Sequence, residues 1–242
     1  MDEQKKQANQ DESLERLKKE IDGRDSFRPE VSLAVIKRLP RYFRYLRELI
    51  RMGKTRVSSA ELSRMMNVTA SQIRQDLNCF GGFGQQGYGY NVNYLYTKIC
   101  EILGVGFGFR AAVIGAGNLG SALVRSPMFE KRGVDVVAMF DVSPSIVGKK
   151  VGEARVYPME ELEARLKEFS VDIAILTLPK EHAVSVAGRL AAAGIHGVWN
   201  FTGKELELGN CGIVVENVHI GDSLMTLCYE VAQKLNDGKD RR

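Results

Sequence analysis

The spacing of apolar residues changes character near the middle of the chain. Over 31–53 they recur at steps of three and four, as at Leu39, Tyr42, Phe43, Leu46 and Ile50, which predicts helix. Beyond residue 109, short apolar runs alternate with helical stretches. We expect strands over 110–114, 134–140, 171–177, 197–201 and 212–215, and helices over 159–168 and 181–193. Apolar strands that alternate with helices predict a parallel, doubly wound α/β sheet.

Two short helices are expected after the first helical stretch. Ser58 stands three residues before Glu61, and Thr69 three residues before Gln72, which is the spacing of a capping box at a helix start. A turn at about 67–68 separates them. The apolar positions of the pair, which we expect to be buried, are Leu62, Met65, Met66, Ile73 and Leu77. The opposite face of the second helix carries Ser71, Arg74, Gln75 and Asn78.

Two further helices are expected. One covers 92–103 and leads into the glycine-rich segment 104–108, which we interpret as a linker. The other closes the chain over 222–235, with one apolar stripe formed by Leu224, Leu227, Cys228, Val231 and Leu235.

A glycine-rich loop follows the first strand of the sheet. Gly115, Gly117 and Gly120 form GxGxxG between that strand and a helix, which is the context of a dinucleotide fingerprint. Gly115 would make the tight turn, Gly117 would admit a pyrophosphate, and Gly120 would allow close helix packing. Asp141 ends the second strand 21 residues later and would bind ribose hydroxyls, which predicts NAD(H) rather than NADP(H). Coenzyme A, another nucleotide, or no nucleotide remain the alternatives.

A second glycine-rich loop, at 81–89, follows a helix instead of a strand. This context predicts a winged helix, in which the second helix of the pair enters the major groove and a hairpin touches the DNA backbone. Arg74 is expected to contact guanine, and Gln72 or Gln75 adenine. Tyr88 and Tyr90 flank the wing. The alternative is a small helical domain that binds protein.

The net positive charge of the N-terminal third of the chain favours a polyanion as its binding partner. Residues 27–76 hold eleven Lys/Arg against four Asp/Glu, a net +7, so the remainder carries −3 of the overall +4. The 44% apolar and 26% charged shares are those of a globular protein. We find no apolar run long enough for a membrane span and no signal-peptide core, so we expect a cytoplasmic protein.

The residue types needed for metal or redox chemistry are sparse. The four cysteines, Cys79, Cys100, Cys211 and Cys228, lack metal-ligand spacing and are expected to be buried thiols, so we expect no metal. Three histidines exist, and one helix follows the last strand, which leaves no room for a substrate domain. We therefore expect no enzyme.

The arrangement resembles the Rex family of redox-sensing transcriptional repressors from about Pro29 onward. The matching phrases are RLP at 38–40, VSSAEL at 57–62, SQIR at 71–74, FGGFG at 80–84, GYGYNV at 87–92, GAGNLGSAL at 115–123, LTLP at 176–179, NFT at 200–202 and VENV at 215–218. We accordingly divide the chain into an extension (1–28), a winged-helix domain (29–106), a Rossmann domain (107–220) and a C-terminal dimerisation helix (221–242).

The resemblance implies a homodimer that binds a pseudo-palindromic operator and exchanges its C-terminal helices. NADH would favour a state that releases DNA, NAD⁺ would compete for the site, and neither would react. The residues expected at the cofactor are Gly115, Ala116, Gly117, Asn118, Leu119, Gly120, Asp141, Val142, Thr177, Leu178, Pro179, Asn200 and Phe201. Those expected at DNA are Arg56, Ser58, Ser71, Gln72, Arg74, Gln75, Asn78, Gly87, Tyr88 and Gly89.

The chain departs from the family pattern in two places. Gln75, Gln85 and Gln86 stand where members usually carry basic residues, which predicts weaker DNA binding and a shallower salt dependence unless Arg41, Arg44, Lys54 and Arg56 compensate. Some members also use a tyrosine–aspartate pair contacted by an arginine as a switch between domains. Those positions fall on Ser126, His219 and Arg44, so only the arginine is kept. We hypothesise that His219 contributes to the contact instead.

Two other functions are consistent with parts of the sequence. One is an NAD-dependent oxidoreductase whose N-terminal domain serves assembly, which turnover of a hydroxy acid would reveal. The other is a thiol sensor using Cys79, in which peroxide would abolish DNA binding and a reductant would restore it.

Overall fold

The computed structural model describes residues 31–79, 84–85 and 88–239. They divide into two compact units: the N-terminal unit, which ends at Gly108, and the C-terminal unit, which begins at Phe109. Each has its own apolar core. The extension predicted at 1–28 lies outside the described residues.

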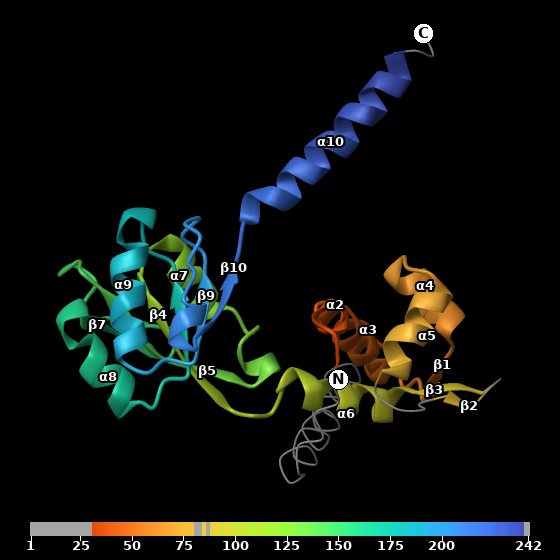
Figure 1. The fold of residues 1–242 in the computed structure, drawn as a ribbon, viewed down its shortest axis with the longest axis horizontal. Coiled ribbons are helices and arrows are strands. Elements are labelled where there is room, and N and C mark those ends of the chain that lie inside the picture. The colour runs from red at the N-terminus through yellow and green to blue at the C-terminus, as the bar shows by residue number, and fades with distance from the viewer. Residues whose placement is uncertain (1–30, 80–83, 86–87, 240–242) are drawn as a thin grey trace, which may run out of the picture. The chain divides into compact units, whose positions relative to one another are not determined.

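The N-terminal unit is a helical cluster with a small antiparallel sheet (Figure 1). Its helices are α2 (Leu33–Ile36), α3 (Leu39–Arg51), α4 (Ser59–Met66), α5 (Ala70–Asn78) and α6 (Val92–Leu103). Its strands are β1 (Arg56–Val57), β2 (Gly84–Gln85) and β3 (Gly89–Asn91), in the order β1-β3-β2. A helix pair followed by such a hairpin is the winged-helix arrangement.

The capping signals place the helix pair as predicted. The Ser58 hydroxyl accepts a hydrogen bond from the Glu61 amide, and the Thr69 hydroxyl accepts one from the Gln72 amide, each at 3.1 Å. Between the helices, Asn67 has φ +49°, a left-handed conformation that asparagine tolerates well. Four of the five apolar positions expected to be buried in this pair are so, and Met65 is half-buried.

The long helical stretch predicted over 31–53 is interrupted. Helix α2 ends at Ile36 and α3 begins at Leu39, with Pro40 in its first turn. Proline fits the first turn of a helix because its missing N–H would be unsatisfied there, whereas inside a continuous helix it would break a hydrogen bond. The apolar period runs across the break, so periodicity alone did not reveal it.

The C-terminal unit is a doubly wound sheet of seven strands in the order β10-β9-β8-β4-β5-β7-β6. The strands are β4 (Phe109–Ile114), β5 (Val134–Asp141), β6 (Lys150–Val151), β7 (Ala154–Pro158), β8 (Ile173–Leu176), β9 (Gly197–Asn200) and β10 (Val214–Asn217). All pair in parallel except β6, an antiparallel edge strand. Without β6 this is the strand order of the Rossmann fold.

The hairpin β6–β7 was missed from the sequence. Strand β6 has two residues, and β7 carries an exposed Arg155 and ends at Pro158, so neither forms a continuous apolar run. Strand β7 nevertheless extends the sheet beside β5, because Val156 is buried against it.

Helices α7 (Asn118–Arg125), α8 (Leu162–Glu168) and α9 (Lys180–Ala192) flank the sheet. Buried residues of α8 and α9 pack with alternate residues of β4, β5 and β8, while α7 packs with the other set. The remaining helix, α10 (Ile220–Lys239), is longer than expected, and the side chains of its apolar stripe are exposed within the single chain. The exchange of this helix between two chains stays a prediction.

Candidate nucleotide and DNA sites

The fingerprint loop is shaped by close backbone packing. Gly115 has φ +103°, and a Cβ there would lie 2.8 Å from the Thr177 carbonyl oxygen. A Cβ on Gly120 would collide with the Gly115 carbonyl oxygen and lie 2.7 Å from the Thr177 hydroxyl. These two glycines are therefore required by the protein itself. The tight turn and the close helix packing are the roles expected from the motif.

Gly117 is different, because the fold does not require it. A Cβ built there would meet no heavy atom within 4 Å in the described part of the chain, and its φ of −68° suits any residue. It is the N-cap of α7 but supplies no side-chain cap, and Gly117, Asn118 and Leu119 are exposed. The loop thus leaves open space at a helix N-terminus, whose amides and dipole favour an anion. This space fits a pyrophosphate.

Asp141 holds the fingerprint loop against the end of β5. Its carboxylate accepts hydrogen bonds from the Ala116 amide at 2.7 Å and from the Ser143 amide at 2.8 Å. Each oxygen retains a further acceptor site, which a ribose hydroxyl can use. Val142 next to it is 79% exposed. The carboxylate acceptors of Asp141 and the open space at Gly117 together fit NAD(H).

The other residues expected at the cofactor lie at the carboxyl ends of β8 and β9. The Thr177 hydroxyl donates to the Gly115 carbonyl oxygen at 2.7 Å, Leu178 is half-buried, and Pro179 is the N-cap of α9. Phe201 is half-buried and packs edge-on against Trp199, with ring centroids 4.5 Å apart. Their position at this edge agrees with the rule that open α/β sheets bind ligands beyond their carboxyl ends.

Asn200 has a structural role that the sequence did not reveal. It is 1% exposed, its amide nitrogen donates to Lys204 and Asn217, and its oxygen accepts from Thr202. Its side chain therefore braces the loop after β9.

This bracing continues to the start of α10. Asn217 donates to Glu205 at 2.8 Å, and the other oxygen of Glu205 lies 2.8 Å from His219 Nε2. A polar network thus links the end of β9 with the residue before α10. Neither Glu205 nor Asn217 was singled out from the sequence, since their role depends on contacts across loops.

Helix α5 presents the polar face expected of a recognition helix. Ser71, Arg74, Gln75 and Asn78 are exposed, and Arg74 makes a long hydrogen bond of 3.4 Å to Ser59. Gln72 is placed differently from expectation. It is half-buried, and its amide nitrogen donates to Asp76 at 2.9 Å, so the adenine contact expected of Gln72 or Gln75 stays a prediction.

The wing is fastened to the rest of the unit at its base. Arg56 in β1 donates to the Tyr88 carbonyl oxygen at 3.2 Å, and Ser58 caps α4 next to it. Gly89 has φ +70°, and a Cβ there would lie 2.7 Å from the Val57 carbonyl oxygen, so this turn needs glycine. Tyr88 is 69% exposed beside it. Gly87 and Gln86 lie outside the described residues.

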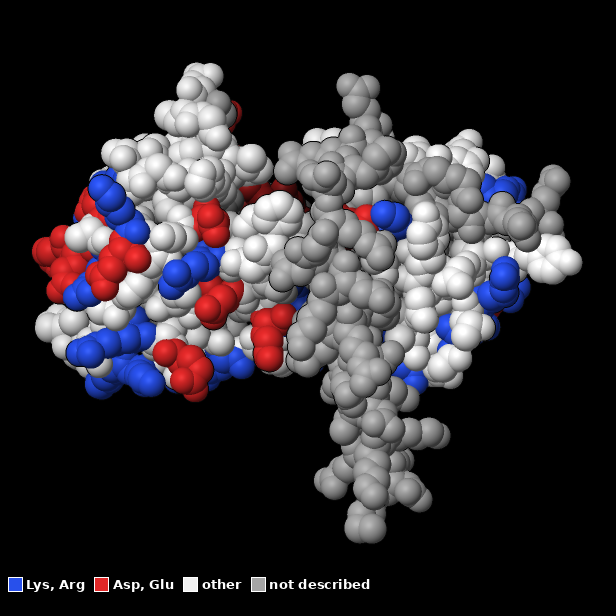
Figure 2. Space-filling model, turned by 90° about the horizontal axis from the view of Figure 1, so that it is seen from below, with Lys and Arg blue, Asp and Glu red and all other residues white. Residues whose placement is uncertain are grey.

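Charged side chains differ between the units. Figure 2 shows one face, on which Lys and Arg of the N-terminal unit have few acidic neighbours while both signs mix on the C-terminal unit. Some cations proposed to compensate for the lost wing charges have partners within the protein. Arg41 donates to the Met66 carbonyl oxygen, and Lys54 pairs with Glu61.

The three residues expected at the switch belong to different units. Arg44 is exposed in the N-terminal unit, with its guanidinium carbon 5.4 Å from the Tyr45 ring centroid. Ser126 is the C-cap of α7, and His219 pairs with Glu205. A contact among the three stays a prediction.

The cysteines differ from expectation. Cys100 is buried, but Cys79, Cys211 and Cys228 are exposed in the single chain. Within the described ranges, no three His, Cys, Asp or Glu residues are grouped as a metal site would require. None of the helices described is both long and apolar enough to span a membrane.

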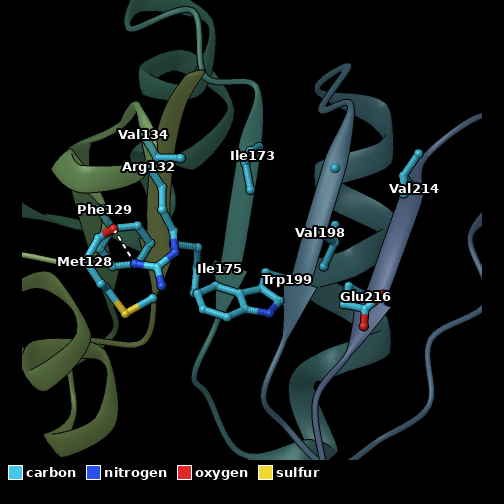
Figure 3. Close-up of a pocket in the computed structure, with 11 residues that line it drawn as sticks. Met128, Phe129, Arg132, Val134, Ile173, Ile175, Val198, Trp199, Val214 and Glu216 are labelled. Carbon is cyan, nitrogen blue, oxygen red and sulfur yellow. Dashed lines mark hydrogen bonds between the residues drawn. The ribbon is translucent and has the colours of Figure 1, made fainter. Parts of the chain in front are cut away.

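An apolar groove of about 430 Å³ lies on the C-terminal unit, away from the fingerprint loop. Figure 3 shows Trp199 and Ile175 between Met128 and Phe129 on one side and Val214 on β10 on the other. The groove lies on the face of the sheet that α7 covers, because Phe129, Ile175 and Trp199 belong to the apolar cluster that includes residues of α7. The connection from β9 to β10 contains a short 3₁₀ turn (Gly209–Cys211) instead of a helix, and its Leu206 and Ile213 pack on the other face.

Comparison with known proteins links the two units to one family. The family described as "CoA binding domain" matches residues 109–203, and "Putative DNA-binding protein N-terminus" matches 30–78. The redox-sensing transcriptional repressor Rex of Caldicellulosiruptor saccharolyticus is 48% identical over 205 residues, covering 85% of this chain and 93% of that protein.

Two solved structures of a Rex-family repressor, RSP, are similar over both units. RSP in complex with β-NAD⁺ and operator DNA is 46% identical with a TM-score of 0.79, covering 88% of this chain and 98% of that one. RSP in complex with β-NADH is 43% identical with a TM-score of 0.79, covering 88% and 99%. At this identity and coverage, the chain belongs to the Rex family of redox-sensing transcriptional repressors.

Proposed function

We propose that this protein is a repressor that binds a pseudo-palindromic operator as a homodimer and leaves it when NADH binds the C-terminal unit. The observation that carries the proposal is the open space at Gly117, at the N-terminus of α7, in a chain whose other unit exposes the polar face of α5. One unit fits a dinucleotide and the other fits a major groove. The cytoplasm, where operator and cofactor meet, is the proposed location.

The cofactor would be held by backbone and carboxylate groups. The loop 115–120 would receive the pyrophosphate, and Asp141 would accept hydrogen bonds from the adenosine ribose. Val142, Leu178, Pro179 and Phe201 would line the remainder. The dinucleotide supplies a ligand whose nicotinamide charge differs between the oxidised and reduced forms. The residues distinguish the two forms by binding and do no chemistry on them.

Operator recognition would combine α5 with the wing. Arg74, Gln75 and Asn78 would face base edges, and Ser58, Ser71, Arg56 and the wing residues Gly87, Tyr88 and Gly89 would face phosphates. The lost positive charges at the wing predict a salt slope shallower by about 0.9 per absent phosphate contact.

Dimer formation is supported by two exposed apolar surfaces of the C-terminal unit. Leu224, Leu227, Val231 and Leu235 are 46–64% exposed along α10, and the groove at Trp199 is uncovered. Exposed apolar areas of this kind mark interaction sites. A second copy, exchanging α10, would cover them.

Release by NADH would be a shift between two populations. NADH must bind the DNA-incompetent state more tightly, and its effect cannot exceed that difference. A coupling free energy of about 1–3 kcal/mol corresponds to a change in operator affinity of roughly 5- to 150-fold. Because the relatives of this chain are transcriptional repressors, the oxidoreductase alternative has no support. The thiol alternative would require peroxide sensitivity at the exposed Cys79.

Fluorescence anisotropy of a palindromic operator duplex tests the proposal. The protein is titrated at one salt concentration without cofactor, with NAD⁺, and with NADH. We expect binding in the first two conditions and release with NADH. Binding that NADH leaves unchanged would contradict the sensing role, and lack of binding at modest salt would contradict the repressor role.

His219 is expected to tune this response through its pair with Glu205. Removing the imidazole in His219→Ala frees Glu205 at the base of α10, so we expect the NADH-induced loss of operator affinity to change several-fold, roughly 1 kcal/mol, with little change in cofactor-free affinity. His196→Ala is the control, because that ring is 82% exposed and 3.9 Å from Asp172. An unchanged NADH response in His219→Ala would refute the idea.

A further inference from the structure

One carboxylate of the N-terminal unit is buried beneath the recognition helix. Asp76 is 1% exposed. Among the residues that the structure describes, it is the buried side chain that carries a charge. It lies on α5 between Gln75 and Leu77, on the side opposite the exposed face. Charged groups are seldom buried without specific partners, so its contacts define its role.

Four hydrogen bonds converge on this carboxylate. Oδ2 accepts from Arg38 Nε at 2.8 Å and from the Tyr42 hydroxyl at 3.0 Å. Oδ1 accepts from Arg38 Nη2 at 2.6 Å and from Gln72 Nε2 at 2.9 Å. The arginine contact is bidentate, which makes it stronger and more directional than a neutral hydrogen bond.

Two of the three donor residues, Arg38 and Tyr42, lie outside α5, whereas Gln72 lies on α5 itself, one turn before Asp76. Arg38 is the N-cap of α3, at the break between α2 and α3, and Tyr42 lies one turn into α3. Ile73 and Leu77 also bury α5 against the core, but apolar contacts are non-directional and tolerate a small rotation of the helix. The bidentate pair fixes that rotation. Because Arg74, Gln75 and Asn78 share the helix with Asp76, the same rotation determines where they point.

The carboxylate is held in its charged form. Burial by itself would raise the pKa of Asp76, but hydrogen bonds from Arg38, Gln72 and Tyr42 outweigh it and leave this pKa below its ordinary 3.8. Burial, and after it the neighbouring Asp76 carboxylate, raise the pKa of Tyr42. Its hydroxyl therefore stays protonated and remains a donor. All four bonds are therefore present at neutral pH.

We propose that Asp76 is a positioning residue for operator recognition, which sets the rotation of α5 through Arg38 and Tyr42 without touching DNA. The proposal rests on the DNA-binding function proposed above. The expected change in DNA affinity is opposite to the one that charge alone would produce. Removing a negative charge from a DNA-binding unit should tighten DNA binding by electrostatics alone, because DNA is a polyanion. The positioning role predicts the opposite for Asp76.

The test compares three variants of the full chain by anisotropy, on the operator and on a scrambled duplex at one salt concentration. For Asp76→Asn we expect operator affinity to fall roughly ten-fold, the scale of one lost base contact, while scrambled-duplex affinity is unchanged or slightly higher. Glu48→Gln is the charge-matched control, because Glu48 is exposed on α3. It should bind both duplexes as well as or better than the unaltered protein.

Tyr42→Phe provides a second variant that keeps every charge. It removes one hydrogen bond to Asp76, so we expect a smaller fall in operator affinity, roughly three-fold, with NADH affinity unaltered. This variant decides the matter if Asp76→Asn does not fold. Equal operator affinity in Tyr42→Phe and the unaltered protein, or tighter operator binding by folded Asp76→Asn, would overturn the positioning role. Failure of the underlying function would appear separately, as absence of operator binding by the unaltered protein.

Discussion

Gly117→Asp is expected to give a protein that binds the operator normally and no longer responds to NADH. The backbone at Gly117 suits any residue, a side chain there meets open space, and aspartate is a favoured N-cap, so the fold should keep its stability. The added carboxylate would face the pyrophosphate. Two unit charges about 4 Å apart repel by about 4 kcal/mol at an effective dielectric constant of about 20. We therefore expect NADH affinity to fall at least ~100-fold.

Gly117→Asn is the matched control, since it adds the same volume and cap without the charge. NADH affinity, measured by the change in NADH fluorescence on binding, should fall less for this variant than for Gly117→Asp. Equal NADH affinity in Gly117→Asp and the unaltered protein would show that the pyrophosphate does not bind at this loop. Gly115 and Gly120 do not suit the test, because a Cβ at either would collide with the backbone.

Arg74→Ala is expected to weaken operator binding by about 1–3 kcal/mol, roughly 5- to 150-fold, and to relax the preference for one base pair. Arg74 is exposed on α5, and its hydrogen bond to Ser59 is long at 3.4 Å, so truncation should leave the fold intact. The measurement is operator affinity on a set of duplexes in which each base pair of a half-site is changed in turn. If Arg74 contacts a guanine, base-pair changes at that one operator position should no longer alter the affinity of Arg74→Ala.

Arg64→Ala is the control for charge alone. Arg64 is exposed in the last turn of α4, in the same unit, and was not expected to face bases. Its removal should lower affinity slightly and equally for every duplex. If Arg74→Ala behaves like Arg64→Ala, Arg74 contributes charge without reading sequence.

Local signals in the sequence located most of the fold. The hydroxyl caps at Ser58 and Thr69 predicted where α4 and α5 begin, because a cap depends on residues three positions apart. The fingerprint glycines likewise predicted the turn from β4 into α7. The strands β6 and β7 were not predicted from the sequence, because a two-residue edge strand and a strand ending in proline show no periodic pattern of apolar residues.

The candidate sites were less predictable where a side chain depends on distant partners. No role was predicted for Asp76 from the sequence, because its partner Arg38 is 38 positions away. Gln72 was expected at a base, but an acceptor one turn further along the helix binds it. Asn200 was expected at the cofactor, which stays a prediction, and its amide also braces a loop. Residue type and spacing show which chemistry is available, while the fold determines which partner uses it.

The most direct test of coupling between the two sites is the reciprocal measurement of NADH binding. NADH is titrated into the protein alone and into the protein saturated with operator duplex, under the salt conditions used for the anisotropy titration. Linkage requires that DNA weaken NADH binding by the same factor by which NADH weakens DNA binding. We expect equal factors, of roughly 5- to 150-fold. Equal NADH affinity with and without operator would contradict the claim that one chain couples the two sites.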